Sequence, residues 1–191
     1  MENTAVHCTY FARSGKENTG DALRIAQTRA EQLGIRSIIV ATTTGDTGAL
    51  ASEVFKSYNL VLVTHTTGSK APNEQELTVD NRRIIEANGG HILTCMYAFG
   101  GIGRAVRQKL NTYQLEEIVA NVLYIFGQGM KVVCEIALMA TDAGLVRAGE
   151  PAVSIAGTHH GADTAVVLQP TNVKHFFDMR VMEILCKPRL P

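Results

Sequence analysis

The chain has 191 residues, which is enough for one domain with a substantial hydrophobic core. Basic and acidic residues number 18 each, so the net charge is zero, and no basic stripe follows the sequence. This balance argues against nucleic acid as a partner. The first residues lack the basic and apolar segments of a secretory signal, and no apolar run reaches membrane-spanning length. We therefore expect a soluble, cytoplasmic protein with no membrane partner.

The four cysteines lie far apart in the sequence, at positions 8, 95, 134 and 186. None has the paired spacing of a zinc site or a redox dithiol. Cysteine often behaves as a small hydrophobic residue, so the interpretation is buried free thiols and no metal.

Strands and helices alternate over the first half of the chain. The expected elements are a strand at 6–11, a helix ending at Gly34, a strand at 36–41, a helix at 47–57, a strand at 60–64, a helix at 74–88 and a strand at 91–95. The β-branched run at 38–40 does not alternate with polar residues, which is typical of a strand buried on both faces. This alternation predicts a three-layer α/β/α fold with a mostly parallel sheet.

From Met96 the alternation of strands and helices ends, and we expect a helical insertion at about 96–142 within a single domain, 1–191. It should contain helices at 114–126 and 130–142. The run Gly100 to Gly103 lacks the full spacing of a dinucleotide fingerprint, so it is interpreted as a mobile, glycine-rich entry. The segment 130–142 is apolar nearly all round, which predicts burial in the core or at an interface of a homo-oligomer.

Two strands, 152–156 and 164–168, follow the insertion. Their link, 157–163, is too short for a crossover helix, so the last strand should be antiparallel to its neighbour. The segment 181–186 could add an edge strand.

Ligands of open parallel sheets bind beyond the carboxyl ends of the strands, where the direction of the connections switches. Four polar loops should meet at that edge: 15–19, 42–47, 64–68 and 157–163. The helix that begins after Thr42–Thr44 would direct unpaired N–H groups there, which favours phosphate, although the carboxylate of Asp46 would repel it. Capping of that helix by Asp46 or Thr47 is the alternative interpretation.

Several single residues could add chemistry to this edge. Lys16 could supply a cation, and His65 could bond to a ligand, while surface or structural roles remain open for both. His159 and His160 beside Asp163 could bind a metal or supply a general base, but adjacent histidines usually point apart and so seldom bind one ion together. No motif identifies a nucleophile, so the catalytic residues are unknown.

These elements resemble the C-terminal α/β domain of pyruvate kinase, and more closely a family of small stand-alone prokaryotic proteins containing that domain. The similarity to pyruvate kinase lies in segments 37–45 and 153–164, which look like its effector-binding loops. The similarity to the stand-alone proteins extends over nearly the whole chain, through 15–19, 45–47, 127–132, 161–164 and 176–178.

The resemblance implies a ligand site but no pyruvate kinase activity, because the barrel that carries that active site has no counterpart here. Asp46 stands where the kinase domain commonly has a basic or neutral residue, which argues against a sugar bisphosphate. The stand-alone proteins are associated with flavin mononucleotide (FMN), so the resemblance implies FMN as the cofactor. The expected site consists of Asn18, Thr19, Thr42, Thr43, Thr44, Gly45, Asp46, Thr47, Thr64, Gly157, Thr158, His159, Gly161, Asp163 and Thr164.

Three hypotheses about function follow. The first is binding of a phosphate-bearing small molecule, with FMN first among candidates and an unknown reaction. The second is a non-catalytic, effector-sensing module that binds a sugar phosphate or nucleotide and dimerises through 130–142. The third is a hydrolase that uses Glu135 or Asp142 as acid or base, although Glu135 would then need a partner in an apolar segment.

Overall fold

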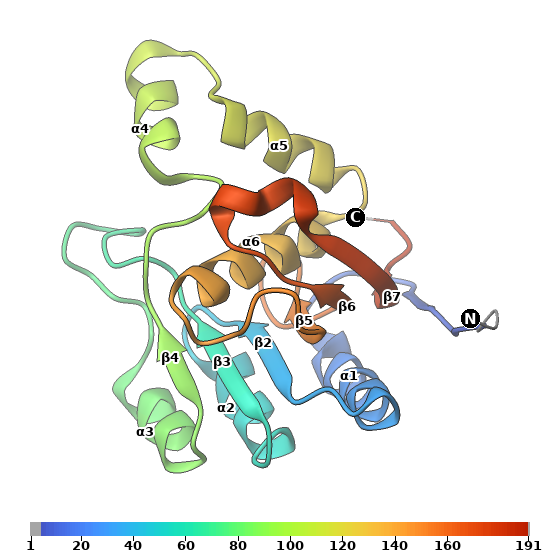
Figure 1. Ribbon diagram of the computed structural model, residues 1–191. Helices are drawn as coiled ribbons and strands as arrows, with labels where there is room; N and C mark the ends of the chain where they lie inside the picture. The colour runs from blue at the N-terminus through green and yellow to red at the C-terminus, as the bar shows by residue number, and fades with distance from the viewer. Residues whose placement is uncertain (1–4, 191) are drawn as a thin grey trace.

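The computed structural model describes residues 5–190, which form one seven-stranded sheet in the order β1-β7-β6-β5-β2-β3-β4 (Figure 1). The strands are β1 (Thr9–Phe11), β2 (Ser37–Ala41), β3 (Asn59–Val63), β4 (His91–Leu93), β5 (Ala152–Ala156), β6 (Thr164–Gln169) and β7 (Arg180–Pro188). All pairings are parallel except those of β6, which is antiparallel to both β5 and β7. The expected mixed sheet with an antiparallel strand near the end of the chain is therefore confirmed.

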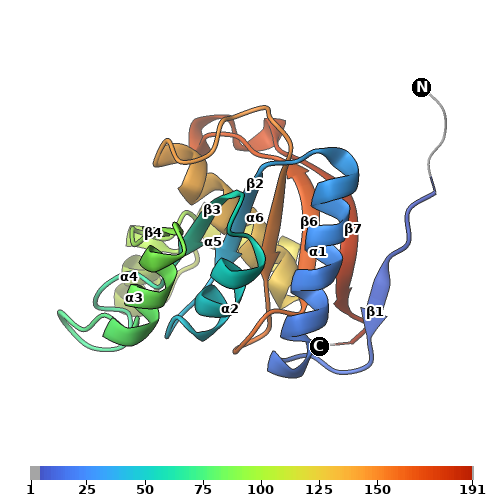
Figure 2. The same ribbon diagram turned by 90° about the horizontal axis from the view of Figure 1, so that it is seen from below.

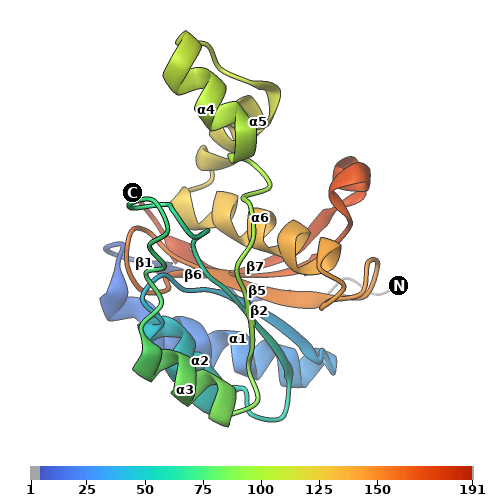
Figure 3. The same ribbon diagram turned by 90° about the vertical axis from the view of Figure 1, so that its left-hand side faces the viewer.

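Helices cover both faces of this sheet. They are α1 (Thr19–Leu33), α2 (Asp46–Val54), α3 (Val79–Ala87), α4 (Gly101–Leu110), α5 (Leu115–Tyr124) and α6 (Gln128–Asp142), with short 3-10 helices η1 (Lys16–Asn18) and η2 (Val173–Asp178). Helices α1 to α3 lie across one face (Figure 2), and α6 lies across the other, with α4 and α5 beyond it (Figure 3). Among residues 5–190, none of the helices combines the length and hydropathy needed to cross a bilayer.

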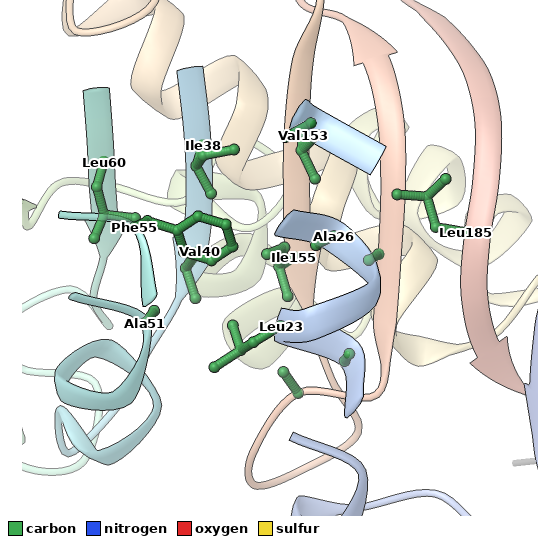
Figure 4. Packing of buried hydrophobic residues seen from close by; sticks show 14 of the residues in the cluster. Leu23, Ala26, Ile38, Val40, Ala51, Phe55, Leu60, Val153, Ile155 and Leu185 are labelled. Carbon is green, nitrogen blue, oxygen red and sulfur yellow. The ribbon is translucent and has the colours of Figure 1, made fainter. Parts of the chain in front are cut away.

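The core has one apolar layer on each face of the sheet. Side chains alternate between the faces of a strand, so Ile38 and Val40 of β2 point to α1 and α2 (Figure 4), whereas Ile39 points to α6. All three are fully buried, which explains the unbroken apolar run in the sequence. Gly129 lets α6 approach the side chain of Thr164 on β6, because a Cβ at that position would overlap it.

The helical insertion expected at 96–142 is shorter in the structure. Helix α6 packs on β2, β3, β5 and β6 and is the crossover helix that leads to β5, so only α4 and α5 are additional to the layers. The glycine-rich run Gly100–Gly103 leads into these additional helices, because Gly101 begins α4. We name α4 and α5, residues 101–124, the arm.

Two other boundaries differ from the expectation. The helix expected at 74–88 begins only at Val79, because the Thr78 side chain accepts a hydrogen bond from the N–H of Asn81 and caps the helix there. The strand expected at 181–186 is longer and is not an edge. It is β7, and β1 pairs beyond it through Cys186 to Pro188, so β1 forms the edge.

Candidate functional site

A cleft of about 810 Å³ opens at the carboxyl edge of the sheet, over the adjacent strands β2 and β5. The chain continues from β2 to β3 on one side, while β5 and β6 lie on the other, so this is the switch point of the sheet. All four expected loops contribute. The lining is formed by Ser14, Gly15, Lys16, Thr19, Ala41, Thr42, Thr43, Thr44, Asp46, Thr47, Leu50, His65, Gln128, Val132, Gly157, Thr158, His159, His160 and Gly161.

The first turns of three helices meet at this cleft. Thr19 of α1, Asp46 and Thr47 of α2, and Gln128 of α6 all contribute to its lining. The first N–H groups of a helix have no acceptor within the helix, and the helix dipole adds a partial positive charge. Three such termini around one cleft favour an anion there.

Thr47 and Asp46 behave differently in the first turn of α2. Thr47 lines the cleft, and its hydroxyl has no hydrogen-bond partner among residues 5–190. Asp46 accepts hydrogen bonds from Thr44 Oγ1 at 2.9 Å and Asn81 Nδ2 at 2.8 Å. The carboxylate is therefore held toward α3 by two donors, while the Thr47 hydroxyl remains available to a ligand.

Asp163 holds two of the loops together although it does not line the cleft. It is fully buried and accepts hydrogen bonds from the N–H of Gly15 at 3.0 Å, the N–H of Thr158 at 3.1 Å and Thr164 Oγ1 at 2.8 Å. A buried carboxylate with three donors is stable without a cation. Asp163 therefore joins the loop after β1 to the loop after β5.

The loop after β5 is also packed closely against the start of α1. Thr19 Oγ1 donates to Lys16 O and accepts from the N–H of Ala162 at 3.0 Å. Gly161 has φ +77° and lies so near Lys16 that a Cβ would overlap its backbone. His159 has φ +59°, an uncommon conformation for a residue other than glycine. These contacts fix the loop that carries His159 and His160.

His65 lies at the other side of the cleft between a carboxylate and a hydroxyl. Its Nδ1 is 2.8 Å from Glu76 Oε2, and its Nε2 is 3.3 Å from Thr43 Oγ1. The Tyr97 ring packs edge-on against the imidazole, with 6.0 Å between ring centroids. Gln75 Nε2 donates to the backbone oxygen of His65 at 3.1 Å. The imidazole is thus held in one orientation.

A second cavity of about 240 Å³ lies beside the cleft and shares His65, Gln128 and Val132 with it. Glu135 lines it, pairs with Lys131 and accepts a hydrogen bond from the N–H of Phe99 at 2.9 Å. Both members of this pair are buried. Lys131 is therefore the partner that Glu135 was expected to need.

Groups around the second cavity affect Tyr124. Burial raises the pKa of the Tyr124 hydroxyl, and the negative charge of Glu135 raises it further, while Arg104 acts in the opposite direction. Tyr124 is therefore protonated at neutral pH and can donate a hydrogen bond.

Asp142 lies away from both cavities. It accepts hydrogen bonds from Asn172 Nδ2 at 2.8 Å and the N–H of Val173 at 3.2 Å, so it anchors the start of η2. Neither Asp142 nor Glu135 lines the cleft. The geometry therefore does not favour either residue as the acid or base of a hydrolase acting there.

Ten of the fifteen residues expected at the site line the cleft: Thr19, Thr42, Thr43, Thr44, Asp46, Thr47, Gly157, Thr158, His159 and Gly161. The other five lie outside the lining: Asn18, Gly45, Thr64, Asp163 and Thr164. Asn18 bonds to Arg13 O and Gly15 O, and Thr64 bonds to Thr94.

The site expected from the sequence left out several residues that line or support the cleft. Leu50 and Val132 are apolar and gave no chemical signal, and Gln128 belongs to a helix assigned to the insertion. Glu76 does not line the cleft but orients His65, and it was placed inside an expected helix. Only contacts between distant segments identify these residues.

A profile of the pyruvate kinase alpha/beta domain matches residues 21–168, which is most of the chain. The chain belongs to the pyruvate kinase alpha/beta domain family. The match includes β2, β5 and the loops that follow them, so both central walls of the cleft belong to the pyruvate kinase alpha/beta domain. The resemblance inferred from the sequence is confirmed.

Two solved structures that match this chain are those of longer proteins. Pyruvate kinase of Cryptosporidium parvum, in complex with ADP, is 17% identical with a TM-score of 0.38, and the match covers 87% of this chain and 24% of that one. O-ureido-L-serine synthase is 19% identical with a TM-score of 0.29, and the match covers 64% of this chain and 47% of that one. This chain thus corresponds to a minor part of each.

Proposed function

We propose that this pyruvate kinase alpha/beta domain protein binds a small phosphate-bearing molecule in the cleft. The observation that carries the proposal is the convergence of three helix N-termini at the cleft, beside the hydroxyl of Thr47, which has no hydrogen-bond partner among residues 5–190. Hydroxyl groups of Thr43 and Thr158 line the same space. Helix N-termini and hydroxyls are the donors that phosphate oxygens need. The volume is also within the range of small-molecule pockets.

FMN is the first ligand to test. The residues present fit its phosphate and hydroxylated chain, because both need donors of the kind that Thr47 and the α2 terminus supply. Leu50 and Val132 are the apolar side chains that would contact a flat ring. Bound FMN would supply hydride or electron transfer, while the protein binds and orients it.

The test is a binding titration of the purified protein with FMN, followed by flavin fluorescence, with inorganic phosphate as competitor. Thr47→Val removes the hydroxyl at nearly constant volume. Loss of a hydrogen bond to a charged group costs about 1.5–3 kcal/mol, so the Kd should rise roughly 10- to 100-fold. Thr28→Val is the control, because Thr28 lies on an exposed part of α1 outside the cleft.

Binding that saturates, competes with phosphate and weakens only in Thr47→Val would support the proposal. Equal affinity of both variants would contradict the placement of the phosphate. An absorption spectrum of freshly purified, desalted protein adds an independent measurement, because flavin bands would reveal a cofactor retained from the cell.

The second candidate is an effector-sensing module that binds a sugar phosphate. The planar groups in the cleft lining are three imidazoles, of His65, His159 and His160, with no larger aromatic ring among the lining residues described. This polar lining favours a compact, hydroxylated ligand over a flat ring. A sugar monophosphate that binds more tightly than FMN, with no turnover, would select this candidate.

A further inference from the structure

Thr43, His65 and Glu76 form a chain of three groups in the order hydroxyl, imidazole, carboxylate. Glu76 Oε2 accepts a hydrogen bond from His65 Nδ1 at 2.8 Å, and Thr43 Oγ1 lies 3.3 Å from His65 Nε2. A carboxylate at Nδ1 places the proton of a neutral imidazole on that nitrogen, so Nε2 is free to accept from the Thr43 hydroxyl. Enzymes that transfer acyl groups through a hydroxyl use the same arrangement: the hydroxyl is the nucleophile, the imidazole is its base, and the carboxylate orients the base.

Thr43 is placed where such a hydroxyl needs to be. It follows the end of β2, lines the cleft and precedes the first turn of α2. Apart from the N–H of Gly48, which donates to Thr42 Oγ1, the first N–H groups of α2 are donors for the oxyanion that forms when a hydroxyl attacks a carbonyl carbon. The side chain of Glu76 is only 21% exposed, so its charge is partly shielded from water.

We propose that Thr43 is a nucleophile for ester substrates, with His65 as its general base and Glu76 as the residue that positions His65. Thr43 Oγ1 attacks the ester carbon while its proton moves to His65 Nε2. The bond to the alcohol then breaks, and the leaving oxygen takes the proton from His65. Water, deprotonated by His65, releases the acid and regenerates Thr43. This activity goes beyond ligand binding and does not depend on the phosphate proposal.

The first experiment uses p-nitrophenyl acetate as the probe. We expect a burst of p-nitrophenolate and an acetyl group on the peptide that contains Thr43, detected by mass spectrometry. Thr43→Ala should abolish both, and Thr43→Ser, with a less hindered hydroxyl, should acylate at least as fast as the wild type. Absence of an acetyl group on Thr43, or an unchanged burst in Thr43→Ala, would overturn the proposal.

Variants of the other two groups separate catalysis from structure. His65→Gln and Glu76→Gln should lower the acylation rate at least tenfold, while His91→Gln, on an exposed histidine outside the cleft, should retain it. Nitrogen NMR of His65 should show a proton on Nδ1 in the wild type and a mixture of tautomers in Glu76→Gln. An unchanged acylation rate in His65→Gln or Glu76→Gln would contradict the proposed roles of these two residues.

FMN or phosphate titration of the same variants distinguishes the two proposals. Glu76 lies outside the lining of the cleft, so a Glu76→Gln variant that loses acylation but retains phosphate binding supports the proposed nucleophile alone. Phosphate binding by a wild-type protein that is never acylated would support ligand binding and reject the proposed nucleophile.

A second and independent observation is an apolar stripe on α5. It consists of Leu115, Ile118, Val122 and Ile125, whose exposed fractions lie between 52% and 79%. Their spacing of three, four and three residues places them on one side of the helix, as in the seam of a helical bundle. Ile102, Leu110 and Phe126 nearby are also largely exposed. The arm therefore leaves an apolar face open, beyond α6 (Figure 3).

We infer that this stripe binds the same stripe of a second copy of the chain across a two-fold axis. At roughly 100 Å² for each side chain, the seven residues expose on the order of 700 Å², close to the ~800 Å² that one partner buries in a stable interface. An uncharged stripe is complementary to itself, as a two-fold interface requires. Helix α6, the interface expected from the sequence, is instead buried in the core.

Sedimentation velocity from low to high micromolar protein tests this interface. The wild type should sediment as a dimer, and Ile118→Glu with Val122→Glu should sediment as a monomer. Val79→Glu is the control, because Val79 is equally exposed but lies on α3, on the other side of the sheet. A wild type that is monomeric throughout, or a stripe variant that remains dimeric, would overturn the inference.

Discussion

The loops of the cleft and the helices of the arm differ in the contacts that their side chains make: buried hydrogen bonds in the cleft, and exposure to solvent in the arm. In the cleft, segments far apart in the sequence are joined by buried hydrogen bonds, such as those of Asp163 to Gly15 and Thr158. In the arm, large apolar side chains such as Leu115 and Ile118 are exposed to solvent. The loops of the cleft are thus held by contacts within one chain, whereas the apolar face of the arm is uncovered among residues 5–190.

This difference indicates two kinds of binding. A cleft whose loops are already fixed loses little conformational entropy when a small ligand enters, which favours specific recognition. An apolar face on two projecting helices gains free energy only when another surface covers it. The following predictions distinguish the two regions by how much a substitution in each changes the stability of the protein.

The largest effect is expected where the arm meets the core. Lys131→Met leaves Glu135 buried without a cation, and this should lower the free energy of unfolding by about 3–5 kcal/mol. The control is the double variant Lys131→Met with Glu135→Met, which removes the unpaired charge and should recover most of the loss. Urea denaturation measures both. Similar values for the single and double variants would contradict this account.

Removal of the carboxylate that joins the cleft loops should have the next largest effect. Asp163→Ala leaves the N–H groups of Gly15 and Thr158 without their acceptor, and we expect a loss of about 3 kcal/mol. Hydrogen exchange of these two amides should accelerate by at least tenfold. Amides that remain protected would show that another group fixes the loops.

A smaller effect should appear in alkaline solution. Burial raises the pKa of Cys134 to about 11 and that of Cys186 to about 12, from the usual 9.0. The folded state thus favours the protonated thiols, so their contribution to stability is full below pH 9 and declines as pH rises toward these values. For each thiol, the free energy of unfolding falls by about 1.4 kcal/mol per pH unit in that range.

Melting temperatures between about pH 8 and pH 11 test this decline. Cys186→Ala should show a shallower decline than the wild type, whatever its stability at neutral pH. Equal slopes would contradict ionisation of Cys186 as a cause, because tyrosines that ionise in the same range are common to both proteins.

The smallest effect is expected in the arm itself. Ile102→Gln, made in the Ile118→Glu, Val122→Glu background so that the protein is monomeric, replaces a residue that is 76% exposed within the subunit, and surface substitutions usually change stability by less than about 0.5 kcal/mol. Urea denaturation should show no shift beyond that size. A larger loss would reveal a contact of Ile102 that stabilises the folded state.

Much of the fold could be predicted because local patterns and tertiary packing agree. The buried run of β2, the Gly34 end of α1 and the short link from β5 to β6 each determine their own structure. The position of β7 inside the sheet could not be predicted, since it depends on pairing with β1 at the opposite end of the sequence. Helix α6 was assigned to an insertion because apolar periodicity does not show what a helix packs against.

The site was predictable to the extent that loop position follows from strand order. Parallel strands end at the same edge, so the loops after β2 and β5 could be placed together from the sequence. The pairing of His65 with Glu76 could not, because these residues come from a loop whose end was expected to be helical. A hydrogen bond between side chains leaves no periodic signal in a sequence.

The pairing of β1 with β7 also has a consequence for folding during synthesis. Thr9 pairs with Cys186, so the first strand finds its neighbour only after nearly all of the chain has been made. Gly15, in the loop that follows, has to wait for Asp163. Contacts of such long sequence separation slow folding. A nascent chain will therefore form the layers around β2 and β3 first, and the cleft will assemble only after Asp163 has been synthesised.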